Sequence, residues 1–76
     1  MKQTMNALRR FQNEIDPLAQ MEILIDTFGV DGVKRNFGIN DLTEDYVETL
    51  DVYSAYDFLE MYESFIIDKW SKLNNK

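Results

Sequence analysis

A long stretch of this chain carries many carboxylates and no basic side chain. Residues 36–68 contain nine Asp and Glu residues and neither Lys nor Arg. The whole chain, in contrast, has fourteen acidic and eight basic residues and a net charge of −6. Within the stretch, a helix would bring five acids onto one face, because intervals of three or four residues relate them: Asp41, Glu44, Asp45, Glu48 and Asp51. Like charges at this spacing repel, so the pattern indicates a surface kept negative for a basic partner or for solubility.

A negative surface of this kind could compete with a nucleic acid for a protein. Carboxylates on successive helical turns lie about 5.4 Å apart, close to the spacing of phosphates along a nucleic-acid strand. Tyrosines alternate with the acids, and tyrosine supplies a large contact area at little cost in rotamer entropy. We therefore expect a protein-binding module that regulates or inhibits a partner with a basic, nucleic-acid-binding surface, by nucleic-acid mimicry. The predicted contact residues are Asp41, Glu44, Asp45, Glu48, Asp57, Glu60 and Glu63, with Tyr53 and Tyr56 as anchors.

The composition argues against an enzyme. His and Cys are both absent, which removes disulfides, thiol nucleophiles, Cys/His zinc sites and every His-based triad. Residues 41–45 begin like a calcium-binding loop, but Tyr46 stands where that loop needs glycine and Val52 where it needs a bidentate Glu. None of the serines lies in a Gly-x-Ser-x-Gly turn. We expect no catalytic residue, no metal and no other cofactor.

Apolar spacing predicts helices along nearly the whole chain. A first amphipathic helix is expected near residues 3–15, with a buried stripe of Met5, Leu8, Phe11 and Ile15. A second helix should begin with Asp16 as its N-cap and Pro17 as its first residue. Gly29 should end this helix, because glycine readily adopts the left-handed conformation found after a C-terminus.

The middle of the chain is less regular. A short third helix is expected over residues 31–37, ended by Gly38. Residues 39–52 contain β-prone types as well as helical spacing, and we favour a helix because a lone strand would have no partner. Asp41 and Glu44 resemble a capping box at the start of this helix.

The longest helix is expected at the C-terminal end of the chain. Ser54, followed three residues later by Asp57, gives a start signal. The apolar residues that follow form a stripe over about five turns: Ala55, Phe58, Leu59, Tyr62, Phe65, Ile66, Trp70 and Leu73.

These elements predict an all-α fold, a compact single-domain bundle of four to five helices over residues 1–76. A hydrophobic content of 45% is enough for one modest core and too high for a disordered chain. No segment approaches the roughly 18 apolar residues of a membrane span, and the N-terminus has no apolar signal segment, so we expect a cytoplasmic protein without membrane contacts. The negative charge argues against direct binding of nucleic acid.

Three alternatives to the acidic-surface hypothesis stay open. The acids could simply solvate one side of the domain while the tyrosines cover the core. Trp70, expected to be half covered, could join Ile67 in an exposed apolar patch through which two copies form a homodimer. The helices between residues 18 and 38 also resemble a helix-turn-helix, whose second helix would present Lys34 and Arg35 to DNA.

Overall fold

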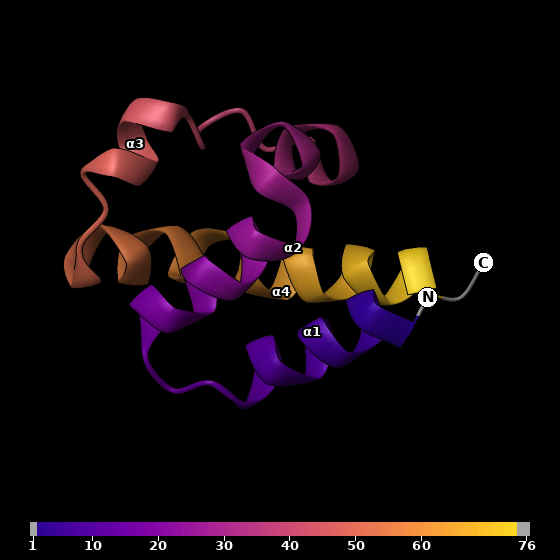
Figure 1. Cartoon of the computed structure of the whole chain (residues 1–76). Coiled ribbons are helices and arrows are strands. Elements are labelled where there is room, and N and C mark those ends of the chain that lie inside the picture. Colours follow the sequence, from indigo (N-terminus) through magenta and orange to yellow (C-terminus); the bar gives the residue numbers. More distant parts are fainter. Residues whose placement is uncertain (1, 75–76) are drawn as a thin grey trace.

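Helices make up most of the structure, a computed structural model that describes the backbone of residues 2–74 and the side chains of residues 5–73. The helices are α1 (Lys2–Asn13), α2 (Pro17–Phe37), α3 (Glu44–Glu48) and α4 (Val52–Asn74). In Figure 1, α1 and the first half of α2 lie beside α4, and the second half of α2 and α3 lie above them. Residues 2–74 contain no strand, so the predicted all-α fold with a long C-terminal helix is confirmed.

Local signals fix both ends of α2 and a break within it. Asp16 is the N-cap, and its carboxylate accepts a hydrogen bond from the backbone N–H of Leu18 at 3.1 Å, while Pro17 is the first helical residue. Gly29 has φ 73° and ψ 167°, which interrupts the helical path and bends α2 where Figure 1 shows it turning. Gly38 follows the helix in the left-handed conformation, with φ 69° and ψ 22°. The predicted cap at Asp16, the first position of Pro17 and the end at Gly38 are confirmed. Gly29 bends the helix and does not end it, so the separate helix expected over residues 31–37 is the second half of α2.

The start of α3 lies further along the chain than predicted. Thr43, and not Asp41, is the N-cap, and its hydroxyl accepts a hydrogen bond from the backbone N–H of Tyr46 at 3.1 Å. The preceding segment is not helical, and it carries Ile39 and Leu42 into the core, where they are 3% and 0% exposed. The helix therefore begins only after these two anchors. Its presence confirms the preference for helix over strand in this region.

The start of α4 lies earlier than predicted. Asp51 and Ser54 form a reciprocal pair, because the Asp51 carboxylate accepts from the Ser54 N–H at 2.9 Å and the Ser54 hydroxyl accepts from the Asp51 N–H at 3.0 Å. This is a capping box with Asp51 at the N-cap position. The proposed start at Ser54 with Asp57 was wrong because Ser54 is the second partner of the box and lies inside the helix.

Trp70 lies at the centre of the core. Its side chain is 0% exposed, and its ring centroid lies 5.5 Å from that of Phe11, 5.0 Å from Phe28 and 6.5 Å from Phe37. Both α1 and α2 therefore close over this part of α4, and the expectation of a half-covered Trp70 was wrong. Ile67 is partly buried against the same core. The apolar patch on which the homodimer hypothesis depended is thus not present on the described surface.

Other apolar side chains that were expected to be buried are partly or fully exposed. Ile15 is 92% exposed, because α1 ends at Asn13 and the helical stripe stops before reaching it. Met5 and Phe65 are 39% and 43% exposed, and the Lys69 ammonium lies 5.5 Å from the centre of the Phe65 ring. Between residues 2 and 74, no helix combines the length and apolar character needed to cross a membrane.

Candidate interaction surface

The outer face of α3 is acidic. Tyr46, Val47 and Leu50 pack partly buried against the core, and the acids occupy the opposite side of the helix because helical neighbours lie three and four residues apart. All three acids of this helix are exposed: Glu44, Asp45 and Glu48. The helix thus holds three of the five acids that the spacing predicted on one helical face, because Asp41 precedes α3 and Asp51 caps α4.

The charges of three further carboxylates act on one phenol between α3 and α4. The hydroxyl of Tyr46 donates a hydrogen bond to the backbone carbonyl of Ser54 at 2.8 Å. Burial raises the pKa of Tyr46 above its ordinary value of 10.0, and the charges of Asp57, Asp51 and Asp41 raise this pKa further. These three acids come from the loop before α3, from the α4 cap and from α4 itself.

A second tyrosine connects this loop to α4. The hydroxyl of Tyr62 donates to the carboxylate of Asp41 at 2.5 Å, and this hydrogen bond is the main cause of a raised pKa for the phenol. The pKa of Asp51 is lowered below its ordinary 3.8, chiefly because its carboxylate accepts from the backbone and hydroxyl of Ser54. The carboxylate of Asp51 is therefore held as an anion by the start of α4.

The remaining predicted residues lie on α4, and they do not all face the same way. Tyr53 and Tyr56 are 79% and 57% exposed, and Glu60 is exposed. Glu63 is half buried, and its carboxylate accepts a hydrogen bond from the side-chain amide of Gln20 on α2 at 3.4 Å. The predicted set thus divides between a group near α3 and a group that faces the start of α2.

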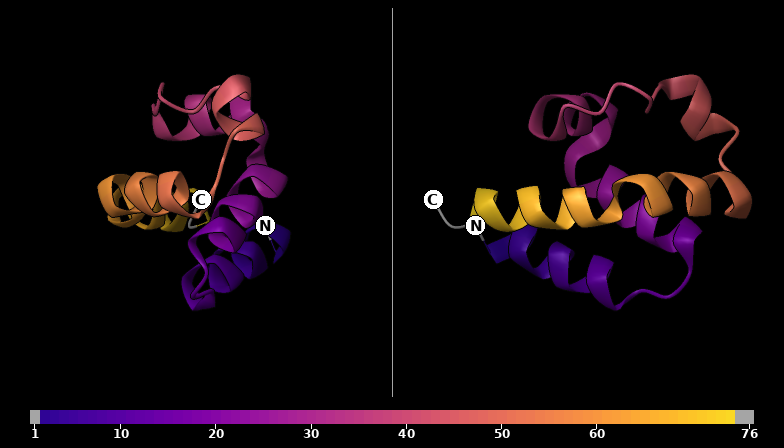
Figure 2. Two further views of the ribbon diagram at one scale, coloured as in Figure 1. Left: turned by 90° about the vertical axis from the view of Figure 1, so that its left-hand side faces the viewer. Right: turned by 180° about the vertical axis from the view of Figure 1, so that it is seen from behind.

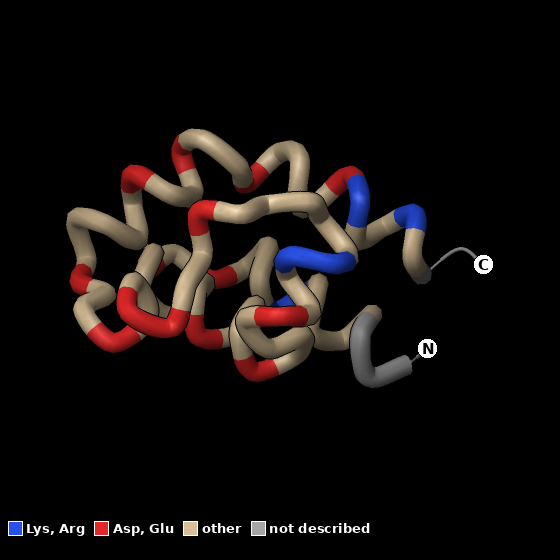
Figure 3. Tube along the Cα trace, turned by 90° about the horizontal axis from the view of Figure 1, so that it is seen from above, with Lys and Arg blue, Asp and Glu red and all other residues tan. Residues whose placement is uncertain are grey.

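Charge is separated along the molecule. In Figure 3, the end that carries α3 and the start of α4 shows acidic positions only, and the Lys and Arg positions lie nearer the end with the C-terminus. The one ion pair among the described side chains joins Lys72 to Asp68 at 3.2 Å, in the last turns of α4. None of the seven predicted contact carboxylates has an ion-pair partner within the described part of the chain.

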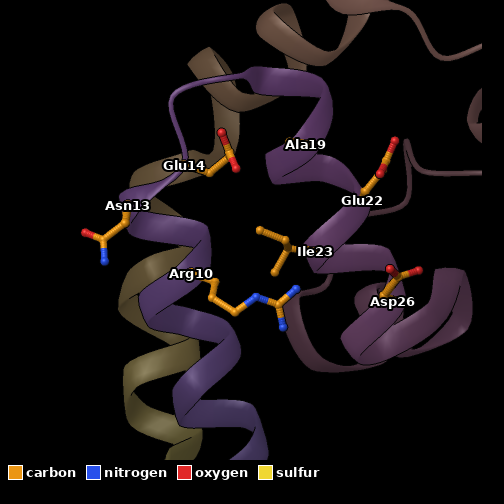
Figure 4. A pocket seen from close by; sticks show the side chains of 7 residues that line it. All are labelled: Arg10, Asn13, Glu14, Ala19, Glu22, Ile23 and Asp26. Carbon is orange, nitrogen blue, oxygen red and sulfur yellow. The ribbon is translucent and has the colours of Figure 1, made fainter.

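A separate hollow of about 460 Å³ lies between α1 and α2 (Figure 4). Arg10 reaches into it from α1, and the acids Glu22 and Asp26 project from α2. Glu14 accepts hydrogen bonds from the backbone N–H groups of Ile15 and Asp16 at 3.1 and 3.2 Å. This hollow mixes both signs of charge, and no three acidic side chains among the described residues are placed to hold a metal ion.

One contact near the acidic residues, the pair of Asp51 and Ser54, could have been predicted from the sequence. The spacing of Asp51 and Ser54 is that of a capping box. Tyr46 and Tyr62 gave no such signal, since their partners lie eight and 21 residues away. Gln20 gave none either, because its contact with Glu63 joins positions 43 residues apart.

A comparison of the chain with models of protein families, with curated proteins and with solved structures found no match. Evidence about function therefore comes from the charge distribution and the side-chain contacts. These show a small helical protein with acidic positions gathered at one end.

Proposed function

We propose that this protein is a small acidic binding module that occupies the basic surface of a nucleic-acid-binding protein and thereby regulates or inhibits it. One observation supports the proposal above the others. The seven predicted contact carboxylates have no ion-pair partner among the described side chains, and the end of the molecule around α3 shows acidic positions only. A surface left with uncompensated charge of one sign attracts and orients a partner of the opposite sign.

The acids of α3 and the tyrosines of α4 would have different roles in such a complex. Glu44, Asp45 and Glu48 stand on the outer face of α3, so they would steer the partner and meet its Lys and Arg side chains. Tyr53 and Tyr56 on α4 would add contact area, because both rings are more than half exposed. Nucleic acid would compete for the same basic residues of the partner.

The proposal is tested by reversing the charge of α3. Immobilised protein is incubated with a native lysate at low salt, and captured proteins are released with duplex DNA. We expect Glu44→Lys, Asp45→Lys and Glu48→Lys together to abolish DNA-displaceable capture while the circular dichroism spectrum stays helical. Capture should also be lost in high salt, because the screening length falls from about 10 Å at 0.1 M to about 3 Å at 1 M.

The matched control reverses three exposed acids elsewhere, Glu22, Asp26 and Asp31, which lie on α2. It changes the net charge by the same amount, so it should retain capture if the position of the charges matters. Unchanged capture by the α3 variant, or equal loss in both variants, would refute the proposal.

A further inference from the structure

A small hollow lies between the α1–α2 link and the first half of α4. Its volume is about 290 Å³, and it is lined by Ile15, Pro17, Gln20, Tyr56, Leu59, Glu60 and Glu63. In Figure 1 and in the rear view of Figure 2, the link lies below α4, at the same end of the molecule as its first half. The hollow contains three of the predicted contact residues, Tyr56, Glu60 and Glu63.

One side of the hollow is apolar and open to water. Ile15 is 92% exposed, although the link around it is fixed by the Asp16 cap and by Pro17 at the start of α2. Tyr56 is 57% exposed, while Leu59 behind it is 4% exposed and belongs to the core. The fold therefore leaves an isoleucine and a tyrosine ring uncovered beside the core.

The other side carries two carboxylates. Glu60 and Glu63 are three residues apart on α4, so their Cβ atoms are about 5–6 Å apart. Neither has an ion-pair partner among the described side chains. The amide of Gln20, a residue only 6% exposed, donates to the Phe11 carbonyl at 2.9 Å and also contacts the Glu63 carboxylate at 3.4 Å.

We propose that this hollow receives an arginine side chain of a protein partner. A guanidinium group has donors for two neighbouring carboxylates and stacks on a tyrosine ring, and its alkyl stem covers apolar side chains. Glu60 and Glu63 supply the carboxylates, Tyr56 the ring and Ile15 the apolar contact. This inference rests on the proposed function, to which it adds the type of residue that the partner inserts on α4.

The test uses the full-length protein and three acetylated, amidated tripeptides, Gly-Arg-Gly, Gly-Lys-Gly and Gly-citrulline-Gly. Citrulline keeps the shape of arginine without its charge. In nuclear magnetic resonance titrations at low salt, the arginine peptide should shift the amide signals of Ile15, Tyr56, Glu60 and Glu63. The citrulline peptide should leave these signals in place, and the lysine peptide should bind more weakly because it cannot stack or bridge in the same way.

Paired variants locate the binding. Glu60→Gln with Glu63→Gln should weaken binding of the arginine peptide by roughly tenfold, since two charge-assisted hydrogen bonds become neutral ones. Glutamine at position 63 keeps an oxygen that accepts from Gln20, so the fold is preserved. The control, Asp26→Asn with Asp31→Asn, removes the same charge at two exposed positions on α2 that do not line the hollow, and it should change the affinity less than about twofold.

Three results would overturn the inference: no shifts at the hollow, equal binding of the lysine peptide, or equal weakening by both variant pairs. The outcome is separate from that of the proposed function. Arginine bound at α3 alone would leave the acidic-module proposal standing and remove the hollow as a site. Arginine bound in the hollow, with partner capture unaffected by reversal of α3, would support the hollow as an arginine site and refute the proposed role of the α3 acids.

Discussion

Tyr62 and Tyr46 each connect the region around α3 to α4 through one hydrogen bond. Tyr62 on α4 donates to Asp41, 21 residues earlier, and Tyr46 on α3 donates to the carbonyl of Ser54. Both phenols have a pKa above the ordinary value of 10.0, Tyr62 mainly through its hydrogen bond and Tyr46 mainly through burial. The folded state therefore favours the protonated form of both groups more than the unfolded state does.

This difference predicts a loss of stability at alkaline pH. A raised pKa stabilises the fold fully below pH 10.0, and the contribution is lost as the pH rises from there through the higher pKa of the folded state. Tyr62→Phe should therefore make the decline above pH 10.0 shallower, as measured by urea unfolding on either side of that pH. Tyr53→Phe, at a side chain that is 79% exposed, is the control, and identical pH profiles for the two variants would contradict the assignment.

At the scale of elements, two glycines determine how α2 runs. Gly29 bends it at φ 73° and ψ 167°, and Gly38 ends it at φ 69° and ψ 22°. A Cβ added at either position would meet nothing within 4 Å, so space does not explain the need for glycine. The reason is the backbone conformation, which at Gly29 lies in a region that is essentially restricted to glycine.

The two positions should therefore differ in their tolerance of a side chain. Gly29→Ala should lower the free energy of unfolding by about 1–3 kcal/mol through backbone strain. Gly38→Asn should cost less, because Asn adopts the left-handed conformation with little penalty. Urea unfolding of the two variants measures the difference, and an equal or larger loss for Gly38→Asn would show that the bend at Gly29 is not required.

At the scale of the whole molecule, the core and the charged surface occupy different places. Trp70 is in ring contact with α1 and with both halves of α2, which joins three segments of the chain. The end around α3 instead presents acidic positions only, whose mutual repulsion opposes folding. The stability that holds this acidic end in place must come from the buried contacts.

The central position of Trp70 predicts a large effect of its removal. Trp70→Ala should lower the free energy of unfolding by about 3–5 kcal/mol, because a fully buried aromatic side chain leaves a cavity at the junction of three segments. Phe65→Ala, on the same helix but at a side chain that is 43% exposed, should cost clearly less. Urea unfolding compares the two, and similar losses would contradict the central role of Trp70.

The sequence predicted features that depend on neighbouring residues. The cap at Asp16, the first position of Pro17 and the glycines at positions 29 and 38 act within about one helical turn, so their types reveal their roles. The starts of α3 and α4 were misplaced by a few residues. At α3, burial of Leu42 keeps the preceding segment out of the helix, and at α4 the true capping box begins at Asp51.

Only part of the candidate surface could be predicted from the sequence. Composition and spacing alone predicted that residues 36–68 carry no positive charge, and that helices would present these acids in groups. Packing between distant segments was needed to place Asp41, Asp51 and Asp57 where their charges raise the pKa of Tyr46, to bring Glu63 to Gln20, to cover Trp70 and to leave Ile15 exposed. The physical reason is that spacing defines the faces of each helix, whereas burial depends on which faces of distant helices come together.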